Sequence, residues 1–272
     1  MTNIMDRFKL DGRVALVTGG AGLLGRGFCR TLAEAGAAVV VADKNKIEAE
    51  KVVAEISPAG KALAVEVDVT QADSVRAMTA AAKEKFGRLD MLVCSAALDP
   101  KFDPHLGGSY EQDFEHYPLE SWRQALDVNL TGAFLSAQAA APLMLEQGGG
   151  VMVTIASIYG LSGPDQRIYR DPQKPAQYKP AYYPASKAGL LGLTRYLAAY
   201  YAGRGIRVNA LTPGGVFNDH DAFFEREYSA RTMLGRMADK DEMNAALLFL
   251  ASDASSYMTG SNLVVDGGWT AW

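Results

Sequence analysis

Short apolar runs alternate with longer segments of helical character along the whole chain. The runs lack the apolar-polar alternation of a half-exposed sheet, and such continuous runs are typical of strands covered on both faces. The expected strands are residues 14–17, 38–42, 62–67, 90–94, 151–156, 206–211 and 263–268. The expected helices are residues 26–36, 46–57, 71–86, 119–147, 188–202 and 239–252.

This alternation predicts an α/β fold. Parallel strands joined by helices need right-handed crossovers, which place helices on both faces of one sheet. We therefore expect a doubly wound parallel sheet of about seven strands, with ligands outside the carboxyl ends of the strands. No repeat, low-complexity tract or linker interrupts the pattern, so residues 1–272 are expected to form a single domain.

Composition excludes several classes of partner. The net charge is −4 and the basic residues are scattered, so neither nucleic acid nor an anionic membrane is expected as a partner. Cys29 and Cys94 lie in apolar runs and are expected to be buried free thiols in a reducing compartment. The first residues show no apolar signal core, and no stretch approaches the roughly 20 apolar residues of a membrane span. We expect a cytoplasmic protein.

A glycine-rich turn follows the first expected strand and leads into the first helix. Gly19, Gly22 and Gly25 let the backbone turn tightly and approach a pyrophosphate. The free N–H groups of the helix start, around Leu23 and Leu24, would bind its negative charge. Strand, glycine turn and helix in this order predict a dinucleotide site, and a tight turn without a ligand is the alternative.

Acidic residues after the second and third strands suggest how a dinucleotide is held. Asp43 can accept hydrogen bonds from the adenosine ribose and repels a 2′-phosphate, which favours NAD over NADP. Lys44 and Lys46 leave NADP as the less favoured alternative. Asp68 and Val69 follow the third strand where the adenine edge would lie, although Asp68 could equally cap the next helix.

A catalytic pair is suggested by Tyr183 and Lys187. Four positions apart at the start of an expected helix, they lie on one helical face. An ammonium close to a phenol favours the phenolate, so Tyr183 could exchange its proton with a substrate oxygen. The alternative is a chance spacing.

Two further polar residues stand out in apolar surroundings. Asn129 is an amide within an apolar stretch of helical period, where its polar groups need a specific partner. Ser157 comes directly after the fifth expected strand, at the edge of the sheet where ligands bind.

With these residues in place, the whole chain resembles the single-domain branch of the short-chain dehydrogenases/reductases, a Rossmann-fold family that uses NAD(P). The resemblance implies that Tyr183 is the general acid/base, that Lys187 lowers its pKa and binds ribose, and that Ser157 orients the substrate oxygen. Asn129 would hold a water that connects Lys187 to solvent. The matching positions that the resemblance assigns to the cofactor are Gly19, Gly22, Leu23, Leu24, Asp43, Asp68, Val69, Ala96, Tyr183, Lys187, Pro213, Gly214 and Val216.

The chain departs from the family pattern in two places near the cofactor. The spacing of Gly19, Gly22 and Gly25 looks like that of the family's extended branch, and Leu23 stands where the single-domain branch has glycine. After the fourth strand the chain has Cys-Ser-Ala-Ala (residues 94–97) in place of Asn-Asn-Ala-Gly. We expect the wall beside the nicotinamide to be held differently.

The third departure concerns the substrate. Ser157 and Tyr183 are about twice as far apart as is usual in the family, so residues 158–181, here called the insert, must loop out and return. The insert carries four prolines and both charge signs: Pro164, Pro172, Pro175, Pro180, Arg167, Arg170, Lys174, Lys179, Asp165 and Asp171. Residues 98–118, here called the acidic segment, leave the same edge of the sheet and carry Asp99, Asp103, Glu111, Asp113 and Glu115. Long loops on a rigid scaffold usually set specificity.

Two interpretations of these loops remain open. The insert could present an arginine to a substrate carboxylate or phosphate. Alternatively, the two loops pair with each other or with another subunit. His105, His116 and His220 match no metal-ligand spacing, so no metal is expected.

Aromatic residues after Pro213 and Gly214 stand where this family often carries a mobile lid. They are Phe217, Phe223, Phe224 and Tyr228. They could close an apolar wall over the nicotinamide or simply pack on a helix face.

The sequence therefore predicts an NAD-dependent oxidoreductase that interconverts a secondary alcohol and a ketone. The polar loops favour a sugar, polyol or sugar acid as substrate. The alternatives are a hydrophobic alcohol or acyl-carrier-bound ketone, or a Rossmann protein that senses nucleotide without turnover. The resemblance also implies a homotetramer or homodimer with the helices of Asn129 and Tyr183 at subunit contacts, and with the terminal tryptophans Trp269 and Trp272 near another interface.

Overall fold

The computed structural model describes residues 3–56, 61–99, 113–174 and 177–272. Its centre is a seven-stranded sheet in the order β3-β2-β1-β4-β5-β6-β7, in which every neighbouring pair is parallel. The strands are β1 Val14–Thr18, β2 Ala38–Asp43, β3 Ala62–Glu66, β4 Met91–Cys94, β5 Gly150–Ile155, β6 Ile206–Pro213 and β7 Asn262–Val265. The helices described are α1 Gly25–Glu34, α2 Lys46–Ile56, α3 Ala72–Phe86, α4 Leu119–Leu126, α5 Gly132–Glu146, α6 Tyr182–Tyr200, α7 Ala222–Ser229 and α8 Asn244–Ala251.

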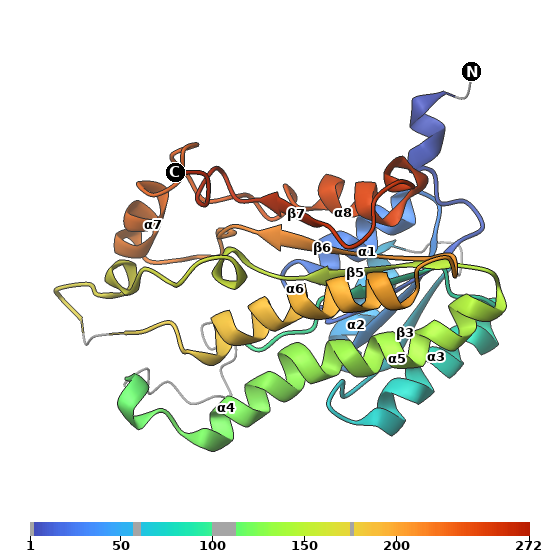
Figure 1. Cartoon of the computed structure of the whole chain (residues 1–272), viewed down its shortest axis with the longest axis horizontal. Coiled ribbons are helices and arrows are strands. Elements are labelled where there is room, and N and C mark those ends of the chain that lie inside the picture. Colours follow the sequence, from blue (N-terminus) through green and yellow to red (C-terminus); the bar gives the residue numbers. More distant parts are fainter. Residues whose placement is uncertain (1–2, 57–60, 100–112, 175–176) are drawn as a thin grey trace.

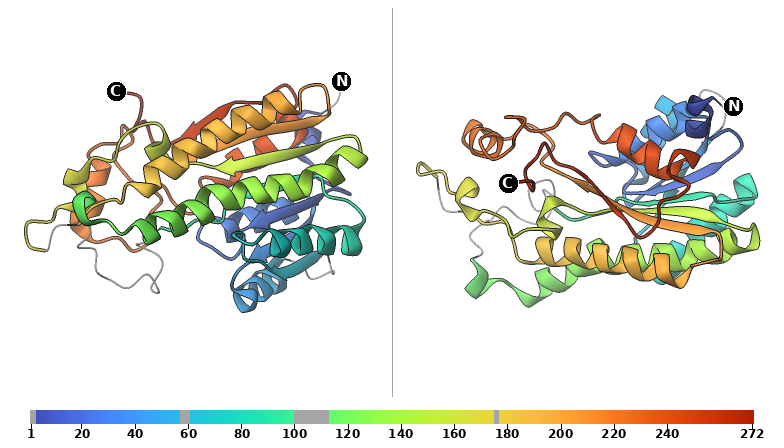
Figure 2. Two further views of the ribbon diagram at one scale, coloured as in Figure 1. Left: turned by 60° about the horizontal axis from the view of Figure 1, so that its bottom comes forward. Right: turned by 45° about the horizontal axis from the view of Figure 1, so that its top comes forward.

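Helices cover both faces of the sheet (Figure 1, Figure 2). Val14 and Leu16 of β1 pack in one core cluster with α3, α5 and α6. Ala15 and Val17, which point to the opposite face, pack in a second cluster with α1, α2 and α8. Because both faces are buried, the strands are continuously apolar, and the predicted doubly wound α/β sheet is confirmed.

The long helix under β4 and β5 has an interruption that the sequence pattern did not predict. Asp127–Thr131 form the π-helical segment η4 between α4 and α5. No stretch long and apolar enough to cross a membrane was expected, but by length and composition alone the span Leu119–Glu146 qualifies. Half of the most apolar 18-residue stretch in this span is buried inside the protein. Its apolar side chains, such as Ala137 and Met144, belong to the core cluster on the sheet.

Some predicted boundaries shift for local reasons. The predicted helix 239–252 begins only at Asn244, because Ala238 pairs in a β-bridge with Val216 and Glu242 accepts a hydrogen bond from the Asp239 amide. Strand β7 ends at Val265, since the Asp266 carboxylate accepts from the Gly268 and Thr270 amides and turns the chain.

The start of helix α6 moves further, by six residues from the predicted start at 188. Helix α6 begins at Tyr182, so it includes Tyr183. Ser57, at the end of the second predicted helix, lies outside the described residues.

The topology places a crevice at the carboxyl ends of the central strands. Strand order reverses between β1 and β4, and ligands in such folds bind outside the carboxyl ends of the strands at this point. The insert and α7 lie at this end, whereas the N-terminal turn η1 (Ile4–Phe8) lies at the other (Figure 1).

Candidate active site

A cavity of about 1720 Å³ opens at the carboxyl ends of the strands. It extends from the glycine turn after β1 to Ser157 after β5 and to Tyr183 in α6. Every residue that the sequence analysis assigned to catalysis or to the cofactor lines this cavity, with the exception of Asn129. The glycine turn, Ser157 and Tyr183 therefore line one continuous cavity.

The glycine turn is closely packed, which explains its composition. Gly19 has a φ of +64°, and a Cβ on it would lie 2.7 Å from the Ala96 Cα. A Cβ on Gly25 would overlap the carbonyl oxygen of Gly19. Leu23 is half-buried and packs on the core cluster that holds α1, so a leucine fits at this departure from the family pattern.

Asp43 is connected directly to the glycine turn. Its carboxylate accepts hydrogen bonds from the Ala21 amide at 3.0 Å and from the Asn45 amide at 2.9 Å. Lys44 forms an exposed ion pair with Asp68 at 3.6 Å. The acidic side chain at the end of β2 therefore lies beside the glycine turn and lines the cavity.

Asp68 does not cap α3. Its carboxylate accepts from the Thr70 amide at 3.0 Å and from the Thr70 hydroxyl at 2.7 Å, whereas Gln71 is the residue that precedes the helix. The Thr70 hydrogen bonds, followed by the charge of Lys44, lower the pKa of Asp68 despite its partial burial. Asp68 and Val69 both line the cavity.

Tyr183 and Lys187 lie one turn apart in α6, on the side that faces the sheet. The Lys187 side chain is buried, and its Nζ donates a hydrogen bond to the Ile155 carbonyl at 2.8 Å. The same Nζ lies 5.6 Å from the centre of the Tyr183 ring. A tyrosine, a lysine and Ser157 thus meet at the end of β5.

Burial dominates the acid-base properties of this group. It raises the pKa of Tyr183 above its ordinary value; the Asp99 carboxylate adds to the rise and the hydrogen bond with Ser157 opposes it. Burial also lowers the pKa of Lys187 to about 8, with Asp99 acting in the opposite direction. The phenol is therefore neutral at neutral pH, which suits a group that donates or regains a proton.

Asn129 holds the backbone beside the cavity. Its Oδ1 accepts from the Leu98 amide at 2.6 Å, and its Nδ2 donates to the Leu98 carbonyl at 3.2 Å and to Ser186 Oγ at 3.3 Å. These contacts satisfy the buried amide that the sequence singled out. They also show how the wall after β4 is held: Asn129 fixes Leu98, and the Thr18 hydroxyl accepts from the Ala96 amide at 3.4 Å.

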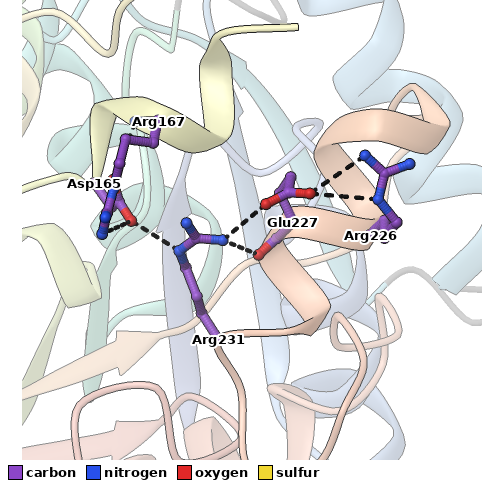
Figure 3. A network of polar contacts seen from close by, with 5 residues as sticks. All are labelled: Asp165, Arg167, Arg226, Glu227 and Arg231. Atoms are coloured by element: carbon purple, nitrogen blue, oxygen red, sulfur yellow. Dashed lines mark hydrogen bonds and ion pairs between the residues drawn. The ribbon is translucent and has the colours of Figure 1, made fainter.

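The insert is attached to α7 through charged residues (Figure 3). Asp165 accepts from the Arg167 guanidinium at 2.8 Å and from Arg231 at 2.7 Å. Arg231 also bonds to Glu227, which pairs with Arg226. The Tyr169 and Phe224 rings pack 5.3 Å apart, centre to centre.

These contacts decide between the two interpretations of the loops. Arg167 pairs with Asp165 and Arg170 lies over the Tyr178 ring, and neither arginine lines the cavity. Lys179 of the insert instead pairs with Asp99 of the acidic segment at 2.9 Å. The loops pair with each other. Asp103, Glu111 and Pro175 lie outside the described residues.

Sequence reasoning assigned no site role to several cavity residues. Lys179 and Asp99 line the cavity, as do Tyr159, Tyr169 and His220. A signal for Lys179 was available: it lies four residues before Tyr183, just as Lys187 lies four residues after it. Asp99 carried no comparable signal, because its loop has no regular spacing.

The aromatic segment both packs and lines the cavity. Phe223, Phe224 and Tyr228 lie on the cavity wall, and Phe217 packs in the cluster behind it. Trp269 stacks on Tyr228 with ring centres 4.4 Å apart. One terminal tryptophan is thus accounted for within the chain, while Trp272 is exposed.

The histidines have other partners. His220 stacks on Phe224, and His116 contacts Asp113. His105 lies outside the described residues. Within the described part of the chain, no cluster of three or more His, Cys, Asp or Glu side chains could hold a metal ion.

Several known proteins are similar to this chain in sequence and fold. The family model described as enoyl-(acyl carrier protein) reductase matches residues 20–270. D-threitol dehydrogenase from Mycolicibacterium smegmatis is 37% identical, over 97% of this chain and 95% of its own length. A short-chain type dehydrogenase/reductase from Mycobacterium marinum is 36% identical, with a TM-score of 0.86 over 100% of both chains.

A further similar structure was solved with ligands. Gluconate 5-dehydrogenase from Burkholderia cenocepacia, in complex with NADP and tartrate, is 32% identical, with a TM-score of 0.85 over 99% of this chain and 100% of that one. The fold, the cavity and these similarities lead to one conclusion. The chain belongs to the short-chain dehydrogenase/reductase family and is an oxidoreductase of CH–OH groups that uses NAD or NADP.

Proposed function

We propose that this enzyme oxidises a secondary alcohol of a polyhydroxylated substrate, such as a sugar, polyol or sugar acid, to the ketone with NAD. The observation that carries the proposal is that Ser157, Tyr183 and Lys187 share one cavity with the glycine turn, where polar residues of both loops surround Tyr183. The relative named D-threitol dehydrogenase supports a polyol, and the neighbour named gluconate 5-dehydrogenase supports a sugar acid.

In this proposal Tyr183 is the general base of the oxidation. Its phenolate takes the hydroxyl proton of the substrate as the carbon loses a hydride, and Ser157 orients the substrate oxygen by hydrogen bonding. When bound, the nicotinamide supplies the hydride acceptor. The Lys187 ammonium stabilises the phenolate by its charge. A water relay from Lys187 through Asn129 stays a prediction, to which the contacts add a positioning role at Leu98.

The residues around the glycine turn fit a dinucleotide. The absence of side chains at Gly19 and Gly25 keeps the turn compact. Leu23, Leu24 and Gly25 at the start of α1 line the cavity, where their N–H groups would bind a pyrophosphate. The Asp43 carboxylate supports NAD, because it would accept from a ribose diol and repel a 2′-phosphate. Lys44 pairs with Asp68, which reduces its availability for that phosphate.

The main rival is a hydrophobic alcohol or an acyl-carrier-bound ketone. The description of the matching family model and the rings of Phe223 and Phe224 on the cavity wall favour it. A nucleotide sensor without turnover is the rival from another class, and the presence of Asn129, Ser157, Tyr183 and Lys187 speaks against it.

The test is reduced-nicotinamide absorbance with purified enzyme, NAD+ or NADP+, and a substrate panel. The panel holds polyols, neutral sugars and sugar acids beside aliphatic and cyclic alcohols. Turnover of polyhydroxylated substrates with a higher kcat/KM for NAD+ is the expected result. Turnover of hydrophobic alcohols alone would contradict the substrate class, and a preference for NADP+ would contradict the role of Asp43.

We further propose a homotetramer or homodimer in the cytoplasm, built from single-domain chains. Exposed apolar side chains on α5 and α6 support association through these helices: Phe134, Tyr196 and Tyr200. Two buried free cysteines support a reducing compartment. One sheet shared by both core clusters supports a single domain.

A further inference from the structure

Lys179 and Asp99 form an ion pair directly over the catalytic tyrosine. Lys179 Nζ donates to both carboxylate oxygens of Asp99 at 2.9 Å and lies 4.0 Å from the centre of the Tyr183 ring. The side chains are only 12% and 22% exposed, and both residues line the cavity. Two ammonium groups therefore lie within 5.6 Å of the centre of the Tyr183 ring, and only Lys187 is part of the family pattern.

Both partners of the pair are fixed by side-chain amides. Gln166 Nε2 donates to the Lys179 carbonyl at 3.0 Å, and Gln166 Oε1 accepts from the Lys179 amide at 2.9 Å. Asn129 makes the same two-bond contact with the peptide groups of Leu98, next to Asp99. A pair that merely joined two loops would not need this positioning at the cavity wall.

The burial of the pair also needs an explanation. Removing two charges from water costs free energy that their attraction offsets only in good geometry, and apolar residues often replace such pairs without loss of stability. A pair kept beside the reacting group is therefore better explained by recognition. The ammonium has three donors, of which two go to Asp99, and a carboxylate oxygen can accept from more than one donor, so the pair can bind a hydroxyl in addition to its existing contacts.

We propose that Lys179 and Asp99 together bind a second, uncharged hydroxyl of the substrate, on a carbon next to the one that is oxidised. A hydroxyl can accept from Lys179 while it donates to Asp99, whereas a carboxylate would be attracted by one partner and repelled by the other. The position over the Tyr183 ring places this hydroxyl close to the reacting carbon. This inference rests on the proposed function and narrows its substrate to vicinal diols.

Two matched pairs of substrates test the proposal. 1,2-Cyclohexanediol and cyclohexanol differ by one hydroxyl, as do 2,3-butanediol and 2-butanol. In the wild-type enzyme the diol of each pair has a kcat/KM about 100-fold higher, because a site built for a hydroxyl rejects a substrate that lacks it. Lys179→Met removes this preference: it lowers kcat/KM for the diols about 100-fold more than for the mono-alcohols, because both classes share only the effect of the unpaired Asp99 carboxylate on Tyr183.

Controls separate recognition from folding and from acid-base effects. Lys83→Met removes a surface lysine that pairs with Glu146 and should alter neither substrate class. If Lys179→Met does not fold, as judged by thermal unfolding, the double variant Lys179→Met, Asp99→Leu removes both charges and leaves neither buried alone.

The outcomes are distinct. An equal loss for diols and mono-alcohols would assign the pair to the pKa of Tyr183 and overturn the proposal. A diol preference that survives both variants would overturn it as well. If the wild-type enzyme oxidised members of the polyol and sugar panel but showed no preference for either diol, this inference would fail and the proposed function would stand. If it oxidised no polyhydroxylated substrate at all, the proposed function would fail, and this inference with it.

Discussion

Tyr183 shows how strongly one side chain depends on its surroundings. As a free phenol it would titrate near 10, and burial together with Asp99 raises its pKa further. The hydrogen bond with Ser157 opposes that rise, and in the proposed mechanism the charge of Lys187 favours the phenolate as well. The acid-base behaviour of Tyr183 is therefore set by its neighbours as much as by the phenol itself.

Replacing the phenol hydroxyl tests this assignment. Tyr183→Phe should lower kcat by about 100- to 10,000-fold, the usual contribution of a positioned acid or base. Binding of reduced nicotinamide, followed by fluorescence titration, should change little. Phe223→Leu, at another residue that lines the cavity, serves as the control for cavity shape. Unchanged oxidation of a good substrate by Tyr183→Phe would show that another group moves the proton.

The pH dependence follows from the direction of the same shift. Oxidation needs the phenolate, and the pKa of Tyr183 is raised, so kcat should increase with pH on the alkaline side. Lys187→Met removes a positive charge near the phenol, which should move this rise to higher pH and lower the rate at neutral pH. A kcat profile from about pH 6 to about pH 10 measures both effects. An identical profile in the variant would contradict the electrostatic role of Lys187.

At the level of elements, the insert and α7 form one unit around the cavity. Asp165 of the insert pairs with Arg231, which follows α7 in the sequence, and Lys179 of the insert pairs with Asp99 of the acidic segment. The insert is thus anchored at both of its sides, and the cavity wall depends on contacts between residues far apart in sequence.

Breaking the first of these anchors should loosen the wall. Arg231→Gln removes a half-buried ion pair and should cost about 1 kcal/mol of unfolding free energy, raise KM several-fold and expose the insert to trypsin. Arg226→Gln, in the same network but on the surface, is the control (Figure 3). Equal effects of the two variants on KM would argue against an anchoring role.

Acid should have a related effect on the same anchor. Its arginine partners, Arg167 first, hold the pKa of Asp165 below its ordinary value of 3.8. A depressed carboxyl pKa stabilises the fold above that ordinary value, and the stabilisation disappears as pH falls below it. Thermal unfolding from about pH 5 to about pH 2 should therefore show a smaller loss for Asp165→Asn than for the wild type. If the two proteins lost thermal stability equally as the pH fell, Asp165 would not contribute to acid unfolding.

The sequence predicted the sheet well because its central strands are apolar on both faces, as β1 and β4 show. It predicted the glycine turn and the tyrosine-lysine pair because their spacing is local. It missed the π-helical turn at Asn129, since one extra residue per turn leaves the apolar pattern nearly unchanged. The Lys179–Asp99 pair was missed for another reason: its members lie 80 residues apart in loops without periodicity.

For the whole molecule, the exposed rings on α5 and α6 give the assembly proposal its test. Phe134, Tyr196 and Tyr200 are 44%, 62% and 56% exposed. If they form a subunit contact, Tyr196→Arg should shift sedimentation velocity toward smaller species at micromolar concentration. Tyr257→Arg, at a fully exposed tyrosine outside α5 and α6, is the matched control. A wild-type protein that sediments as a monomer would sink the proposal.

The segment η1 lies at the amino ends of the strands, where the enzyme could be attached to a solid support. None of its side chains is buried, and it lies at the end of the sheet away from the insert and α7 (Figure 1). The cavity opens at the carboxyl ends of the strands, beside the insert and α7. Trp269, near the other end of the chain, stacks on a ring of the cavity wall. An enzyme tethered to a solid support through η1 would therefore present its cavity to the solution, whereas a tether close to Trp269 would begin beside the cavity mouth.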